Sequence, residues 1–245
     1  MNRTLTPRRA NRALALTASA LLVFGASCTD DPASVEPTTI EPTASDEPAE
    51  PASIPAPNST STWTDPASIS SSLTDEEIAG LMWMREEEQL AHDVYVVLGE
   101  LWNLRIFDNI SSAETAHIEA VSGLLDLYGL DDPAAGNETG TFTDPALQRL
   151  HDQLVEDGSR SLEAALEVGA LIEELDIVDL VARAAATDNP EISAVYANLE
   201  RGSRNHLRAF VSQLDSRGVT YTPTQLDPAT FDAIVSSDTE RGSGS

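Results

Sequence analysis

Carboxylate and imidazole side chains interrupt the apolar stripes of four segments that have helical periodicity. In each segment apolar residues recur at alternating steps of three and four, the spacing of one face of an α-helix. At the middle of each stripe, polar side chains replace the expected apolar ones: Glu88; Glu114 and His117; Glu173 and Asp176; Ser203 and His206. If the stripes face one another, four carboxylates meet in an interior where every unpaired charge is costly. Divalent cations would neutralise them, so the pattern predicts a metal site.

The types of side chain favour particular metals. Carboxylate oxygens and imidazole nitrogens suit iron or manganese, and helical bundles hold such ions with inward Glu residues and Glu-x-x-His pairs. The predicted ligands of one or two divalent ions, with iron or manganese favoured, are Glu88, Glu114, His117, Glu173, Asp176 and His206. A metal-free interior stays open as the alternative, in which these side chains hydrogen-bond one another and some carboxyl groups remain protonated.

Other polar residues near the stripes are expected to play lesser parts. Glu173 is preferred over Glu174 as a ligand, since Glu174 falls on a different face of its helix. Three side chains are expected beside the ligands rather than on the metal: Tyr95, His92 and Ser203. Three others are expected to face solvent: Glu86, Glu87 and His151.

The helices that must position these residues have recognisable ends. The first begins at Thr74, where Glu77 three residues on completes a capping box. The second is expected to be capped near Ser111 or Ser112 and to end at Gly129. The four long helices are predicted to cover residues 74–102, about 111–128, about 161–186 and about 190–217.

The predicted fold class is all-α: a four-helix bundle over residues 74–217 with one long crossover connection. The crossover, residues 130–158, joins the second helix to the third and holds a weaker helix near 145–157. Residues 218–245 contain two prolines and end in Gly and Ser, and they are expected to form a loosely ordered tail.

The sequence resembles the ferritin-like, rubrerythrin-type carboxylate bundle. Within that superfamily, the strings at 85–95, 172–177 and 202–210 resemble a bacterial and archaeal domain-of-unknown-function family, DUF2202. The resemblance covers about residues 74–217 and implies a left-handed four-helix bundle, with the long crossover between its second and third helices, and a symmetric dinuclear metal centre. The superfamily template has Glu three residues before the last histidine, where this chain has Ser203, and this departure leaves open a mononuclear or an unequal site. The chain also lacks the Cys-x-x-Cys electron relay of rubrerythrins.

The N-terminal segment is typical of an exported lipoprotein. Residues 1–28 run from basic to apolar to small residues and end at Cys28, the only cysteine of the chain. The pattern predicts a lipoprotein-type signal peptide in which Cys28 is lipidated, and it places the protein outside the cytoplasm on a membrane. An uncleaved anchor helix is the alternative. Residues 29–73 are rich in Pro, Ser, Thr and Glu and are predicted to be a disordered tether.

The charge balance excludes one class of partner. With 41 acidic and 14 basic residues the formal net charge is −27, which repels phosphate backbones and argues against nucleic-acid binding. The predicted function is therefore an exported metal-binding protein. If it is an oxidoreductase, it acts with dioxygen or peroxide and takes electrons from an external donor. The alternative is a metal-free helical binding or structural module at the cell surface.

Overall fold

The structure, a computed structural model, describes residues 73–241, and this part of the chain is all-α. It contains six helices and no strand: α2 (Asp75–Trp102), α3 (Arg105–Tyr128), α4 (Pro145–Gly158), α5 (Leu162–Ala184), α6 (Pro190–Asp215) and α7 (Pro228–Val235). No helix in this range is both long and apolar enough to cross a membrane. The predicted signal peptide with Cys28, and all of the predicted tether except residue 73, lie outside the described residues.

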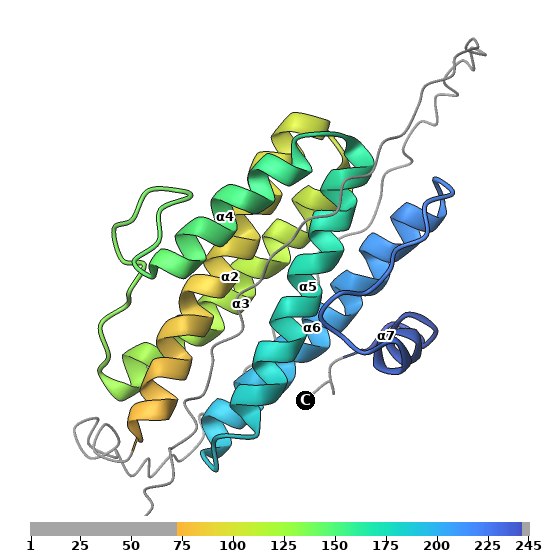
Figure 1. Cartoon of the computed structure of the whole chain (residues 1–245). Helices are drawn as coiled ribbons and strands as arrows, with labels where there is room; N and C mark the ends of the chain where they lie inside the picture. Colours follow the sequence, from red (N-terminus) through yellow and green to blue (C-terminus); the bar gives the residue numbers. More distant parts are fainter. Residues whose placement is uncertain (1–72, 242–245) are drawn as a thin grey trace, which may run out of the picture. The chain divides into compact units, whose positions relative to one another are not determined.

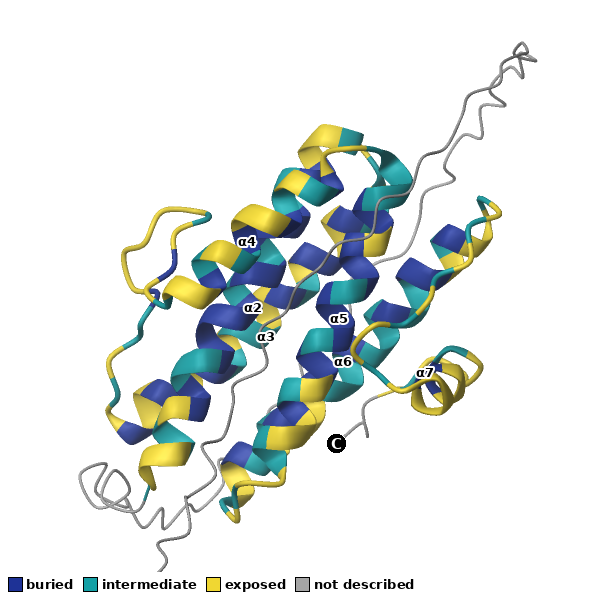
Figure 2. Ribbon diagram, in the orientation of Figure 1, coloured by how far each residue is buried: buried dark blue, intermediate teal, exposed yellow. Residues whose placement is uncertain are grey.

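Four long helices pack around a common interior (Figure 1). The α2 helix packs against α3 and α5, and α6 packs against α5 and α3. The crossover helix α4 lies against α2 and α5. Figure 2 shows buried residues along the facing sides of these helices and exposed residues on their outer sides.

The apolar core is divided into two clusters along the helices. One contains Leu81, Met84, Val121, Leu124, Tyr128, Leu180, Tyr196 and Leu199. The other contains Tyr95, Leu98, Phe107, Ile110, Leu166, Leu207 and Phe210. In every long helix the polar stripe residues fall in sequence between members of these two clusters. The polar residues therefore form one layer with apolar packing above and below it.

Local signals set the helix ends. The Thr74 hydroxyl accepts from the Glu77 backbone N–H, and the Glu77 carboxylate accepts from the Thr74 N–H, which confirms the predicted capping box. Gly129 ends α3 in the left-handed region with φ 66°, a conformation that costs glycine no side-chain clash. Asn189 caps α6, and Pro190 occupies its first turn.

The predicted start of the second helix was wrong. The α3 helix begins at Arg105, directly after Asn103 ends α2 in a left-handed conformation with φ 50°. Ser111 lies inside α3, where its hydroxyl donates to the Asp108 carbonyl oxygen. Serine hydroxyls can bond within a helix in this way as well as cap one, so sequence alone misplaced the boundary.

The predicted loose tail was also wrong for the described residues. Asp227 caps α7 and Pro228 begins it, and this short helix packs against α6. Phe231 and Ile234 are buried on its inner face, and the Tyr221 ring lies 5.8 Å from the Phe231 ring. Two apolar residues at i and i+3 give this short helix one face that it can bury only against the bundle.

Candidate metal centre

Five of the six predicted ligands come together in two overlapping clusters. The first cluster is Glu88, Glu114 and His117, and the second cluster is Glu114, Glu173 and His206. Within each cluster the possible ligand atoms all lie within 4.8 Å of one another. The two clusters share Glu114, so ligands from α2, α3, α5 and α6 meet at one carboxylate.

The His117 imidazole faces the carboxylates of the first cluster. Its Nδ1 atom lies 2.7 Å from Glu114 Oε2 and 3.2 Å from Glu88 Oε2. The opposite edge of the ring lies against the backbone of Gly202 on α6, where a Cβ atom would collide with it. Gly202 therefore provides the space that lets His117 turn its Nδ1 toward Glu88 and Glu114.

The second cluster uses the other oxygen of the shared carboxylate. His206 Nδ1 lies 2.8 Å from Glu114 Oε1 and 3.6 Å from Glu173 Oε2. The approach to Glu114 lacks hydrogen-bond geometry, and both atoms are buried without a hydrogen-bond partner. The two imidazole rings stack with centroids 5.6 Å apart. Each Glu114 oxygen therefore serves one histidine.

Burial and mutual charge set the protonation states. Burial raises the pKa of Glu88 to about 7, although the His117 charge lowers it in part. Burial likewise raises the pKa of Glu173 to about 7 against the charge of His206. For Glu114 burial is outweighed by His206 and His117, which hold its pKa below the usual value.

The pKa values of the two histidines are set by the carboxylates beside them rather than by burial. Burial lowers their pKa values, but the neighbouring carboxylates prevail and raise the pKa of His117 to about 12 and that of His206 to about 10. In the metal-free protein both imidazoles are therefore protonated on both nitrogens and positively charged at neutral pH. A cation that bound here would replace those protons.

The residues present fit a metal ion. Glu88, Glu114 and Glu173 are each 1 % exposed, and Glu88 Oε1 is buried with no hydrogen-bond partner. Buried carboxylate oxygens normally have partners. Oxygen and imidazole donors of this kind are what iron and manganese take in helical proteins. The unpartnered oxygens are positions that a cation would satisfy.

The sixth predicted ligand stands apart from both clusters. The Asp176 carboxylate accepts a hydrogen bond from the Ser203 hydroxyl, and its other oxygen, Oδ1, is buried without a partner. Burial raises the pKa of Asp176 well above its usual value. The structure therefore pairs Asp176 with Ser203 rather than with a histidine.

Of the residues expected beside the ligands, Tyr95 contacts a cluster and His92 does not. The Tyr95 hydroxyl donates to Glu173 Oε1 at 2.5 Å and is fully buried, so it touches the second cluster. His92 does not come to the clusters, and its Nδ1 lies 2.9 Å from Asp93 Oδ1. Of the neighbouring Glu173 and Glu174, only Glu173 belongs to a cluster.

Three side chains expected in solvent are buried instead. The Glu86 carboxylate accepts from the backbone N–H groups of Thr143 and Asp144 at the start of α4. Glu87 accepts from the Trp83 indole N–H at 3.0 Å. His151 packs against Phe142 with ring centroids 5.2 Å apart. All three are covered by the crossover or by α5, elements that a single-helix pattern cannot show.

A well-defined cavity of the bundle lies away from the ligand clusters. This cavity, of about 230 Å³, lies between α2, α5 and α6, where Gly80, Arg183 and Tyr196 are among the residues that line it. No member of either cluster lines it. The ligand layer itself lies between the two apolar clusters of the core.

Comparison with known proteins identifies the family. Residues 77–238 match the family model described as "Uncharacterized protein domain (DUF2202)". A protein of Methanocaldococcus jannaschii named Uncharacterized protein MJ0754 is 47 % identical over 170 residues, which are 69 % of this chain and 92 % of that protein. The crystal structure of hypothetical protein MJ0754 from Methanococcus jannaschii DSM 2661 is similar with a TM-score of 0.68 and 46 % identity, covering 69 % of this chain and 96 % of that chain. The matched residues include both clusters and α7, and the chain belongs to the DUF2202 family.

Proposed function

We propose that this protein is a ferritin-like metal-binding protein whose two clusters each hold one divalent ion, with iron or manganese favoured. The observation that carries the proposal is the Glu114 carboxylate, which turns one buried oxygen toward each histidine. Ferritin-like bundles hold two ions with inward Glu residues and Glu-x-x-His pairs on facing helices, and Glu114 would be a ligand common to both clusters. The four long helices and the crossover between α3 and α5 are compatible with that fold.

The protein's own residues would hold and shield the ions. Glu88 and His117 complete the first cluster, and Glu173 and His206 complete the second. The Tyr95 hydroxyl fixes the position of Glu173, while apolar side chains on both sides of the layer exclude water. Iron or manganese bound here would supply redox chemistry with dioxygen or peroxide, and the electrons would come from an external donor because the only cysteine is Cys28.

The same proposal includes a place in the cell. The N-terminal pattern supports export and attachment to a membrane through a lipidated Cys28. Replacing Cys28 with Ser should then move the protein from the membrane fraction to the soluble fraction. A variant that stays in the membrane fraction would show that the attachment does not depend on this cysteine.

Metal analysis of the purified full chain tests the centre. After anaerobic loading with Fe²⁺ or Mn²⁺ and removal of free metal, we expect about two equivalents of bound metal. Glu114→Ala removes the shared ligand and should reduce both sites, leaving well under one equivalent. Glu119→Ala is the matched control, because Glu119 is an exposed glutamate on the same helix. Less than about a tenth of an equivalent in the unmodified chain would defeat the metal proposal and favour the metal-free helical module.

A further inference from the structure

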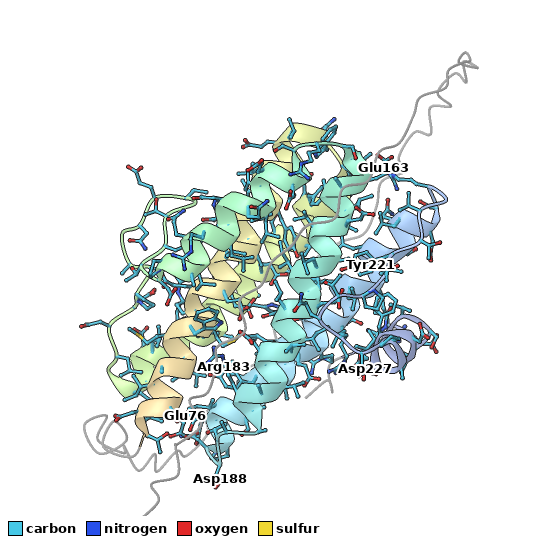
Figure 3. The ribbon with its side chains drawn as sticks, viewed as in Figure 1. Glu76, Glu163, Arg183, Asp188, Tyr221 and Asp227 are labelled. Carbon is cyan, nitrogen blue, oxygen red and sulfur yellow. The ribbon has the colours of Figure 1, made fainter. Side chains whose placement is uncertain are left out.

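The C-terminal segment 219–241, here called the strap, runs over the outer sides of α5 and α6. Besides the packing of α7 against α6, polar contacts hold it at two places, one on each helix. Tyr221 lies beside α5 and Asp227 lies near the start of α7 in Figure 3. Both attachment places involve charged side chains of the bundle that have no role in the ligand clusters.

The first attachment is the Glu174 carboxylate on α5. It accepts hydrogen bonds from the Tyr221 hydroxyl at 2.5 Å and from the backbone N–H groups of Thr224, Gln225 and Leu226 at 3.0, 2.8 and 2.8 Å. Glu174 is 0 % exposed. All of these donors belong to the strap, so the strap provides the hydrogen bonds that this buried carboxylate requires.

The second attachment is made by α6 to Glu240 near the end of the strap. Arg204 donates to both oxygens of the Glu240 carboxylate at 2.7 and 2.6 Å, and Arg208 donates to one of them at 2.7 Å. Asn205 exchanges two hydrogen bonds with the Glu240 backbone at 3.0 and 2.9 Å. Paired, charge-assisted contacts of this kind fix direction as well as distance.

Both attachments adjoin ligands of the second cluster in the sequence. Glu174 directly follows Glu173, and Arg204, Asn205 and Arg208 flank His206. Adjacent residues on a helix point about 100° apart, so holding Glu174 from outside fixes the rotation that turns Glu173 inward. Among the helices, α7 packs only against α6. No hydrogen bond joins the described strap to α2 or α3, which carry all three ligands of the first cluster, the shared Glu114 included; α2 is held from outside by the crossover, through Glu86.

We infer that the strap positions Glu173 and His206 and thereby sets the metal affinity of the second cluster, while leaving the first cluster unaffected. Glu174 and Glu240 are positioning residues in this account. The inference rests on the proposed metal centre. On this inference the C-terminal segment contributes to metal binding, although none of its residues is a ligand.

Mn²⁺ titration of the full chain by calorimetry, with electron paramagnetic resonance to count bound ions, tests the inference. His117→Ala leaves only the second site to be measured, and His206→Ala leaves only the first. In the His117→Ala background, Glu174→Gln should weaken Mn²⁺ binding by about tenfold or more. In the His206→Ala background the same change should leave affinity within about twofold. Glu163→Gln is the matched control, because Glu163 lies on α5 away from Tyr221 in Figure 3.

If Glu174→Gln fails to fold, the same titrations can be made with Glu240→Gln. Its side chain is 31 % exposed, so no buried group loses its partners, and a selective loss of about threefold at the second site is expected. Hydrogen exchange of the metal-free protein should rise around residues 203–208 and not around 114–117. Equal weakening of both sites, or no weakening in a folded variant, overturns the inference. Absence of Mn²⁺ binding by the unmodified chain would instead overturn the proposed function.

Discussion

Glu114 and Ser203 stand three residues before the two clustered histidines, one in the α2–α3 pair and the other in the α5–α6 pair. In the first pair the carboxylate reaches both imidazoles. In the second pair the serine is too short to do so, and its hydroxyl donates to Asp176 instead. The two helix pairs thus carry the same spacing of residues and different chemistry.

The difference between Glu114 and Ser203 limits the number of buried charges in the ligand layer, because only one of the two positions carries a carboxylate. A second glutamate at position 203 would add another buried charge beside Glu88, Glu114 and Glu173, whose burial already raises the pKa of two of them. Serine avoids that charge, and each cluster is left with two carboxylates and one histidine. The second cluster includes ligands from the helix pair that the C-terminal strap holds from outside.

The largest expected effect comes from removing one histidine at a time. His117→Ala should abolish binding at the first cluster and His206→Ala at the second, so each variant should hold about one equivalent of metal instead of two. The measurement is metal content after anaerobic loading. If either change removes both ions, the clusters act as one inseparable site and the comparison between the two helix pairs fails.

The pH dependence of metal-free stability is the next largest effect. Burial raises the pKa of Glu88 and Glu173 from 4.5 to about 7. A carboxyl group with a raised folded pKa contributes stability below pH 4.5, which is lost as the pH rises through about 7. Each group should lower the free energy of unfolding by about 3 kcal/mol over that range. Urea unfolding of the metal-free protein at pH 5 and pH 8 measures this.

Neutral variants separate the two helix pairs in the same experiment. Glu88→Gln and Glu173→Gln should each remove a similar share of the loss between pH 5 and pH 8, because the two groups have similar shifts. Glu119→Gln, on the exposed side of α3, should leave the pH dependence unchanged. If the unmodified chain and both Gln variants lost the same stability between pH 5 and pH 8, these carboxyl groups would be ionised throughout that range.

Gly202→Ala tests a contact between the two helix pairs. A methyl group here would collide with the His117 ring, so the imidazole must move and metal affinity at the first cluster should fall about tenfold. Gly123→Ala is the control, since nothing lies within 4 Å of the added Cβ atom, and it should stabilise α3 by about 1 kcal/mol. Unchanged metal affinity in Gly202→Ala would show that His117 is free to shift without loss of binding.

The smallest effect is expected for Ser203→Ala. Loss of the hydroxyl removes the hydrogen bond to Asp176 and should cost about 1 kcal/mol of metal-free stability. The number of bound ions should not change, because Ser203 belongs to neither cluster. Ser212→Ala, on the exposed side of α6, is the matched control. Loss of one ion in Ser203→Ala would make the serine a direct ligand.

Periodicity along single helices made much of the molecule predictable. The capping box at Thr74, the glycine end of α3 and the buried stripes follow from residues close to one another in the sequence. A polar residue in an apolar stripe is visible without a structure because helix geometry fixes which residues share a face. The same geometry favoured Glu173 over Glu174.

Contacts between elements decided the rest. Only the packed structure shows that Glu114 serves two histidines, that Asp176 turns to Ser203 and that Glu174 is satisfied by the strap. The burial of Glu86 and of the tail was not predictable from the sequence, because both depend on partners at least 47 residues away or on an adjoining helix. A helical pattern fixes which way a side chain points, whereas the partner it meets depends on how distant segments pack.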